Sequence, residues 1–196
     1  MRTGKDSDGL SIWWRRGVII VMILGFALLI NLTVESYFTA PPIPEKAVTT
    51  DGKVIFTKAD IEAGQEVFLK YGLMDNGTIW GHGAYLGPDF SASYLHNLSV
   101  DAQESIAQSS YQNSFEALTL PEQQAVQAQV TDLLKENRYD VSSGILTLSA
   151  EEATSFQNQV TVWSDYLSST VSAAGLQNEL IKQPEQIRQL TSFFAW

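Results

Sequence analysis

Cysteine is absent from this 196-residue sequence. Its absence excludes disulfide bonds, zinc–thiolate centres, iron–sulfur clusters and covalently attached haem, because each of them needs thiols. Histidine is almost as scarce, with only His82 and His96 in the chain. A mononuclear metal site ordinarily takes three or four good ligands, so these two side chains do not make one by themselves.

Basic residues are few, since 12 lysines and arginines face 22 acidic residues and leave a net charge of −10. Four of the basic residues fall within positions 1–16, so the remainder of the chain is more acidic than the average suggests. A surface of this charge repels a phosphate backbone. We therefore expect no nucleic-acid partner.

One long hydrophobic run is present, from Val18 to Val34, and only Asn31 and Thr33 interrupt it. A helix over residues 17–38 is long enough to cross a hydrocarbon core of about 30 Å. Aromatic residues flank the run on both sides, as they do at membrane interfaces. The pattern predicts one transmembrane helix.

The charges around this run predict its orientation. Arg15 and Arg16 precede it directly, and few positive charges follow closely. The positive-inside rule then places residues 1–16 in the cytoplasm and the acidic domain outside. The alternative is a signal peptide cleaved after Ala40, which the bulky Phe38 at the −3 position and Pro41 after the cut disfavour.

The rest of the chain divides by composition into a proline-rich linker at 39–46, a domain at 47–183 and a last segment at 184–196. Asp51-Gly52 and Ser142-Ser143-Gly144 each separate short β-prone runs, which predicts two hairpins. Apolar residues at helical spacing predict four helices in the domain. We expect Thr57, Ser91, Thr119 and Ser149 to cap their first turns, three of them in capping boxes completed by Asp60, Glu122 and Glu152.

The stretch from Gly64 to Phe90 resembles the start of a cytochrome c domain, in which a short helix leads into the haem-attachment loop. When Gly83-Ala84-Tyr85 is aligned with the Gly-Ala-Tyr of the haem-c subunit of bacterial nitric oxide reductases, the attachment motif falls on residues 73–77. These residues are Leu-Met-Asp-Asn-Gly, so both thiols and the iron-binding histidine are missing. The frame resembles a cytochrome c without its haem chemistry.

Residues 13–196 as a whole resemble the N-terminal region of quinol-dependent nitric oxide reductases, most densely at 70–96 and 190–196. The resemblance implies a mainly α fold, with one N-terminal transmembrane helix and an extracytoplasmic, haem-free, cytochrome-c-like domain carrying small β-hairpins. It also implies a close helix crossing at Gly64 and a second membrane helix after residues 184–196. The location implied is the bacterial inner membrane, with the main domain in the periplasm.

The same resemblance implies a function. The whole enzyme reduces two NO to N2O with quinol electrons, using haem b, haem b3 and a non-haem iron. None of these cofactors has its ligands in this chain, so the segment is expected to have no catalytic centre. Its implied roles are to cap the catalytic multi-helix region and to help hold a structural calcium.

Gly83 and Tyr85 are the candidate calcium ligands that the resemblance implies, through a carbonyl and a hydroxyl oxygen. Calcium takes six to eight oxygens, so the catalytic part would supply the others. The alternative is a tyrosine packed under the loop. Trp80 and His82, in the same glycine-rich loop, are candidate contacts with the catalytic part.

The other polar candidates have simpler interpretations. His96 is expected at a helix surface, and Asp75 and Asp89 as a turn acid and a helix-start acid rather than a route for protons or cations. Non-covalent haem between the two histidines would demand that they meet across one ring. A hypothesis for the missing haem is that Trp80, Phe90, Tyr94 and Trp163 fill its volume.

Two rival functions stay open from the sequence. One is a stand-alone, membrane-tethered periplasmic binding or sensor module with the glycine loop as its pocket. The other is an electron-carrying cytochrome, which predicts a Soret absorption band that the reductase interpretation does not.

Overall fold

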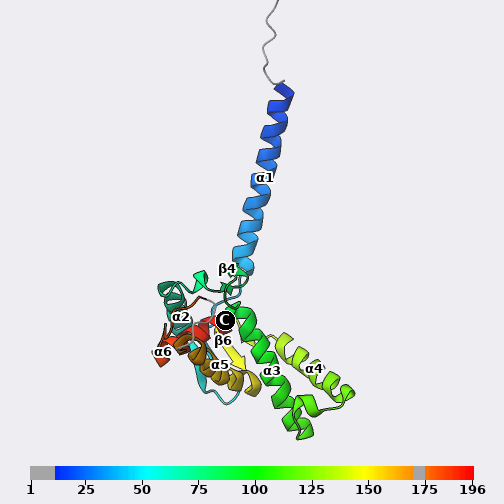
Figure 1. Ribbon diagram of the computed structural model, residues 1–196. Helices are drawn as coiled ribbons and strands as arrows, with labels where there is room; N and C mark the ends of the chain where they lie inside the picture. Colours follow the sequence, from blue (N-terminus) through cyan, green and yellow to red (C-terminus); the bar gives the residue numbers. More distant parts are fainter. Residues whose placement is uncertain (1–11, 170–174) are drawn as a thin grey trace, which may run out of the picture. The chain divides into compact units, whose positions relative to one another are not determined.

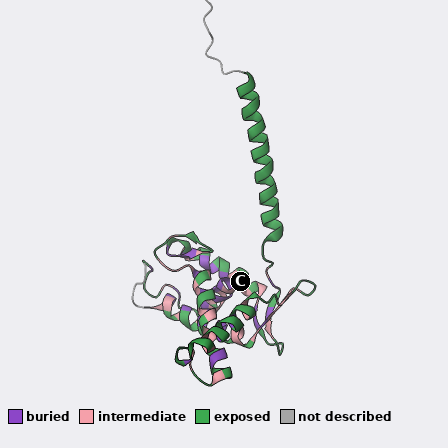
Figure 2. Cartoon of the chain, turned by 90° about the vertical axis from the view of Figure 1, so that its right-hand side faces the viewer, coloured by how far each residue is buried: buried purple, intermediate pink, exposed green. Residues whose placement is uncertain are grey.

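The computed structural model describes residues 12–169 and 175–196, and most of the predicted cytoplasmic segment 1–16 therefore lies outside the described residues. The chain separates into two compact units, one ending at Pro42 and the other running from Ile43 to Trp196. Figure 1 follows the course of the chain, and Figure 2 shows which residues are buried. Each unit is described by itself.

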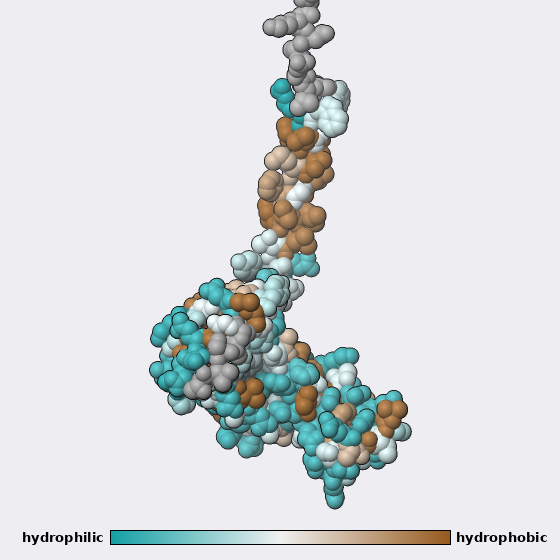
Figure 3. All heavy atoms as spheres, viewed as in Figure 1, coloured by the Kyte–Doolittle hydropathy of each residue, from teal (hydrophilic) through white to brown (hydrophobic). Residues whose placement is uncertain are grey.

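The first unit contains helix α1, Ile12–Thr39, whose 28 residues include the predicted span 17–38. A helix of that length extends about 42 Å, more than the thickness of a bilayer's hydrocarbon core. None of its residues is buried, and its apolar side chains cover most of its surface (Figure 3). Length and composition make α1 a candidate membrane span.

The second unit has a mainly helical fold, as predicted. Its helices are α2 (Lys58–Lys70), α3 (Phe90–Tyr111), α4 (Leu120–Lys135), α5 (Ala150–Ser168) and α6 (Pro184–Ala195). The three predicted capping boxes are confirmed at the starts of α2, α4 and α5. In each, the side chain of the cap and the acid three residues later satisfy backbone N–H groups that the first helical turn leaves unpaired.

Ser91 does not cap α3, contrary to the prediction. The helix begins one residue earlier, at Phe90, and Asp89 is its N-cap. The Asp89 carboxylate accepts the N–H of Ala92 at 2.8 Å, and the Ser91 hydroxyl donates to the same carboxylate at 2.7 Å. A charged carboxylate is the better acceptor at a helix N-terminus, so it takes the capping position.

Both predicted hairpins form, and they join into one small sheet. The strand order is β2-β1-β6-β5, with antiparallel pairing inside each hairpin and parallel pairing between β1 and β6. The strands are β1 (Lys46–Thr49), β2 (Val54–Thr57), β5 (Tyr139–Asp140) and β6 (Ile145–Leu148). An isolated hairpin of this length is marginal in water, and pairing two of them shields one edge of each.

Helices α2 and α6 cross at Gly64, which confirms the close approach that the resemblance implied. A Cβ built on Gly64 would lie 2.0 Å from the carbonyl oxygen of Gln189 and 2.9 Å from Cβ of Phe193. Only a residue without a side chain allows the two backbones to come this close. Helix α6 is therefore a core element of this unit, with Leu190 completely buried.

The core beside this crossing is rich in aromatic rings. Phe90 is fully buried and stacks on Phe194, with ring centroids 4.9 Å apart. Phe68 and Trp163 contact Phe90 at centroid distances of 5.7 and 5.5 Å. Phe90, Tyr94 and Trp163 are buried, whereas Trp80 is 55% exposed. The hypothesis that these four side chains fill the volume of the missing haem is therefore wrong for Trp80 and stays a hypothesis for the other three.

Candidate functional site: the glycine loop between helices α2 and α3

The glycine loop comprises residues 72–88, and it turns back on itself. It contains a 3-10 turn, Leu73–Asp75, and a two-stranded ladder of β3 (Thr78–Ile79) and β4 (His82–Gly83). The ladder was not predicted, because two-residue strands leave no periodic signal in a sequence. Leu73 is fully buried, so a packed side chain occupies the first position of the missing haem-attachment motif.

Asn76 fastens the middle of the loop to helix α5. Its side-chain Oδ1 accepts a hydrogen bond from the Tyr166 hydroxyl at 3.0 Å, and its backbone carbonyl accepts the N–H of Gly87 at 2.6 Å. A Cβ on Gly87 would lie 2.3 Å from that same Oδ1. The glycine therefore lets the returning part of the loop lie directly against the Asn76 side chain.

Asp89 fastens the end of the loop. Its Oδ2 accepts from the Thr78 hydroxyl at 2.7 Å and the Gly81 N–H at 2.6 Å, in addition to the cap interactions of its Oδ1. Burial acts to raise the pKa of Asp89, but the hydrogen bonds from Ala92, Ser91, Thr78 and Gly81 outweigh it and lower the pKa from 3.8 to about 2. Asp89 is thus a helix-start acid, as predicted, and its carboxylate also joins two parts of the loop to the start of α3.

Because the pKa of Asp89 is lowered in the folded chain, the fold should lose stability as the pH falls. A carboxylate whose folded pKa is below its unfolded pKa stabilises the fold fully above about pH 4, and the contribution is lost as the pH falls towards about 2. Replacing Asp89 by asparagine should therefore lower the free energy of unfolding most near neutral pH. The difference from the native chain should shrink between pH 4 and pH 2, measured by urea unfolding at each pH.

The matched control is Asp75→Asn, which removes the same charge from an exposed side chain of the same loop. It should give a much smaller difference at neutral pH. A loss of stability in Asp89→Asn that stays constant down to pH 2 would contradict the role of the ionised carboxylate.

Gly83 and Tyr85 differ in how they are packed. Gly83 has φ +138°, and a Cβ there would lie 2.3 Å from the carbonyl oxygen of Gly77. The next residue, Ala84, donates its N–H to the carbonyl of Met74 at 2.8 Å. The Tyr85 side chain, in contrast, is 87% exposed, so the alternative of a tyrosine packed under the loop is wrong.

The remaining candidates lie apart from one another. His82 is exposed on β4, with its ring Nδ1 2.9 Å from the carbonyl oxygen of Trp80, whereas His96 is exposed on α3. Within 12–169 and 175–196, no three His, Cys, Asp or Glu side chains are grouped so that they could hold a metal ion. Gly83 and Tyr85 offer two oxygens, fewer than the six to eight that a calcium ion takes.

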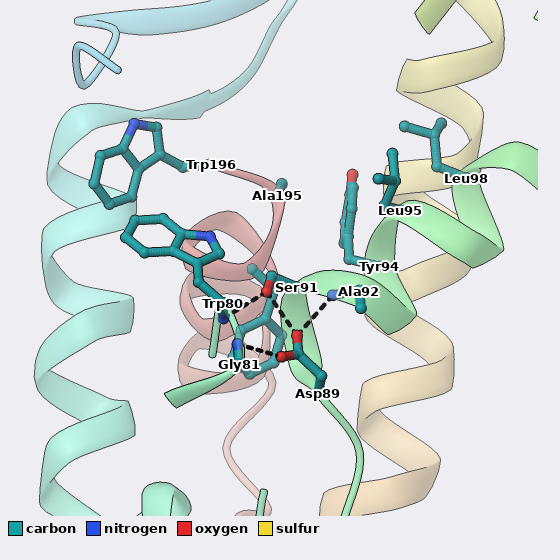
Figure 4. Close-up of a pocket in the computed structure, with 11 residues that line it drawn as sticks. Trp80, Gly81, Asp89, Ser91, Ala92, Tyr94, Leu95, Leu98, Ala195 and Trp196 are labelled. Carbon is teal, nitrogen blue, oxygen red and sulfur yellow. Dashed lines mark hydrogen bonds between the residues drawn. The ribbon is translucent and has the colours of Figure 1, made fainter. Parts of the chain in front are cut away.

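Sequence reasoning missed a cleft of about 530 Å³ beside the loop, between the start of α3 and the end of α6 (Figure 4). Trp80 and Trp196 lie on one side of it, with ring centroids 5.3 Å apart, and Leu95 and Leu98 on the other. The two tryptophans are more than a hundred positions apart in the sequence, and no local pattern indicates that they meet.

A family comparison identifies the domain. Residues 44–196, most of the chain, match the NorB cytochrome c-like family, which is the cytochrome c-like domain of nitric oxide reductase. The chain belongs to this family. No curated protein gives a significant match to the sequence. Membership relates the chain to nitric oxide reductase, an oxidoreductase.

Proposed function

We propose that this chain is the non-catalytic, N-terminal part of a quinol-dependent nitric oxide reductase, and that its domain caps the catalytic region from the periplasmic side. The family match to residues 44–196 supports the connection to this enzyme class. The absence of cysteine supports a domain that does not relay electrons through haem c. A quinol donor in the membrane would make such a relay unnecessary, because it delivers electrons to haem b directly.

The proposal assigns a role to each part of the chain. Helix α1 is the retained anchor, with the N-terminus in the cytoplasm as the charges at Arg15 and Arg16 favour. Helix α6 precedes the catalytic region, whose membrane helices carry haem b, haem b3 and the non-haem iron. The exposed side chains of Trp80 and His82 contact that region.

The loop also contributes two oxygen ligands to a calcium ion that the catalytic region completes. The observation that carries this assignment is the contrast within residues 83–85. The backbone at Gly83 is fixed against Gly77 and Met74, whereas Tyr85 projects almost its whole side chain into solvent. A preorganised loop lowers the cost of ordering ligands around the ion, and bound calcium would hold domain and catalytic region together.

Replacing Tyr85 by phenylalanine in the complete enzyme tests the assignment. The change removes one oxygen and leaves the ring, so the fold of the domain should be unchanged. Loss of the hydroxyl should weaken calcium binding by at least about tenfold. Mutating a residue that only hydrogen-bonds to a metal ligand already costs about 10- to 100-fold in affinity, and Tyr85 is proposed as a ligand itself. Calcium content after graded chelator treatment, measured by elemental analysis, gives the affinity.

Tyr139→Phe serves as the matched control, since it removes a tyrosine hydroxyl from β5 instead. It should retain calcium like the native enzyme. Equal calcium retention in both variants would refute the ligand role of Tyr85. A chain that purifies alone from its native membrane, without a reductase, would favour the stand-alone binding module.

A further inference from the structure

Asn31 is a polar residue near the middle of helix α1, which the function proposed above uses only as an anchor. The predicted span 17–38 is centred between Ala27 and Leu28, so a rise of about 1.5 Å per residue places Asn31 about 5 Å from the middle of the membrane. That depth is well inside a hydrocarbon core of about 30 Å. A carboxamide there has N–H groups and a carbonyl oxygen that lipid tails cannot pair.

Helix α1 does not itself satisfy this amide. The Thr33 hydroxyl, the other polar group of the run, donates to the carbonyl oxygen of Leu29 at 2.8 Å. The Asn31 side chain, in contrast, makes no hydrogen bond to any residue within 12–169 or 175–196. Asparagine side chains in transmembrane helices form hydrogen bonds across to neighbouring helices. Because the rest of the run is almost entirely apolar, Asn31 is the residue that indicates which side of α1 a neighbour covers.

The residues on the same side of α1 as Asn31 suit close packing between helices. They recur at alternating intervals of three and four positions, the spacing that keeps one side of a helix against its neighbour. Gly17 and Ala27 are small, and small residues allow the backbones of two membrane helices to approach closely. We call this surface the Asn31 face, and it comprises Gly17, Ile20, Leu24, Ala27, Asn31 and Val34.

The charges at the ends of the Asn31 face disfavour a second copy of the chain as its neighbour. Arg16 lies beside the face at its N-terminal end, and Glu35, one turn after Asn31, lies beside it at the other end. Two copies in one membrane would insert in the same orientation, so their α1 helices would be parallel and like charges would approach at both ends. Membrane helices of the catalytic region would belong to the same polypeptide, and a tethered partner has a high effective concentration.

We propose that the Asn31 face packs against a membrane helix of the catalytic region, and that the Asn31 amide forms a hydrogen bond with a polar side chain of that helix inside the hydrocarbon core. The inference rests on the function proposed above and adds a partner for α1. It makes the helix a packed member of the membrane bundle, in a register that one polar contact fixes, where an anchor needs no particular neighbour.

Photo-cross-linking of the complete enzyme in its native membrane tests the contact. Benzoylphenylalanine in place of Leu24 lies on the Asn31 face, and the same probe in place of Phe26 lies on the opposite side of the helix at nearly the same depth. The Leu24 probe should form adducts with a membrane helix of the same polypeptide, identified by mass spectrometry of the cross-linked peptides. The Phe26 probe should react mainly with lipid.

Asn31→Leu tests the hydrogen bond, because it keeps the approximate size of the side chain and removes the amide. It should lower the ratio of helix adducts to lipid adducts at the Leu24 probe by about threefold, the typical effect of one hydrogen bond between membrane helices. Thr33→Val is the matched control, since the Thr33 hydroxyl is paired within α1 on the side away from the Asn31 face. It should leave the ratio unchanged.

The inference is overturned if the Leu24 probe reacts with lipid or with a second copy, if the two probes give the same adducts, or if Asn31→Leu leaves the ratio unchanged. The peptides of the purified protein test the proposed function separately. A protein that contains the catalytic region but shows no cross-link to it contradicts the inference alone. A chain that purifies without any catalytic region contradicts both.

Discussion

Replacing Gly64 by alanine is expected to destabilise the domain by about 3 kcal/mol, although helix propensity alone predicts a gain of about 1 kcal/mol. The sign is decided by what the new methyl group meets. A Cβ at this position would lie 2.0 Å from the backbone carbonyl oxygen of Gln189. A backbone atom has no alternative rotamer, so α2 and α6 would have to move apart.

A loss of that size should lower the melting temperature by about 6–12 °C in a domain of roughly 150 residues, measured by calorimetry or circular dichroism. Gly25→Ala is the matched control, because the same change on helix α1 would meet nothing within 4 Å. It should leave the melting of the domain unchanged. An unchanged or raised melting temperature in Gly64→Ala would show that the two helices are not in contact there.

Phe90→Ala should have the larger effect of the two, a loss of about 4 kcal/mol and about 8–16 °C in melting temperature. Phe90 is fully buried, and its ring contacts Phe68, Trp163 and Phe194. Removing it leaves a cavity that these rigid rings cannot close by changing rotamer. The edge-to-face and stacked contacts, which add to the value of simple burial, are lost as well.

Trp80→Ala is the informative comparison, since it deletes a larger aromatic side chain from a half-exposed position. Its effect on the free energy of unfolding should be about 2 kcal/mol, half that of Phe90→Ala, because more than half of the Trp80 side chain is already exposed. Equal losses of stability in the two variants would mean that Trp80 is a core residue after all. Urea unfolding monitored by circular dichroism separates the two outcomes.

The local elements could be read from the sequence because their signals are local. A capping box such as Ser149 with Glu152 needs only two residues three positions apart, and the hairpin turn at Asp51-Gly52 needs only adjacent ones. The one wrong cap was that of α3, where Asp89 and Ser91 lie two residues apart and both can cap a helix. The choice between Ser91 and Asp89 depended on Thr78 and Gly81, which lie across the loop and bond the same carboxylate.

The candidate site was only partly predictable, because its geometry also depends on residues that are distant in the sequence. The resemblance located Gly83 and Tyr85, and the structure adds that one has its backbone locked while the other is exposed. Trp80 shows the limit most clearly. Its hydrophobicity indicates burial, but the left-handed turn that carries it places the ring at the surface beside Trp196. Nothing in the surrounding sequence fixes that direction.

By itself the sequence determined that the chain has no cysteine for disulfides or covalent haem, that an apolar helix lies near its N-terminus and that the domain is mainly helical, since each depends on composition or on spacing along the chain. The resemblance at residues 70–96 and 190–196 indicated the family, which the family match confirms. The tertiary structure decided which aromatic residues form the core, which acid holds the loop and where the cleft lies. Those features arise where α2, α3, α5 and α6 meet, and contacts between distant segments become visible only when the chain is folded.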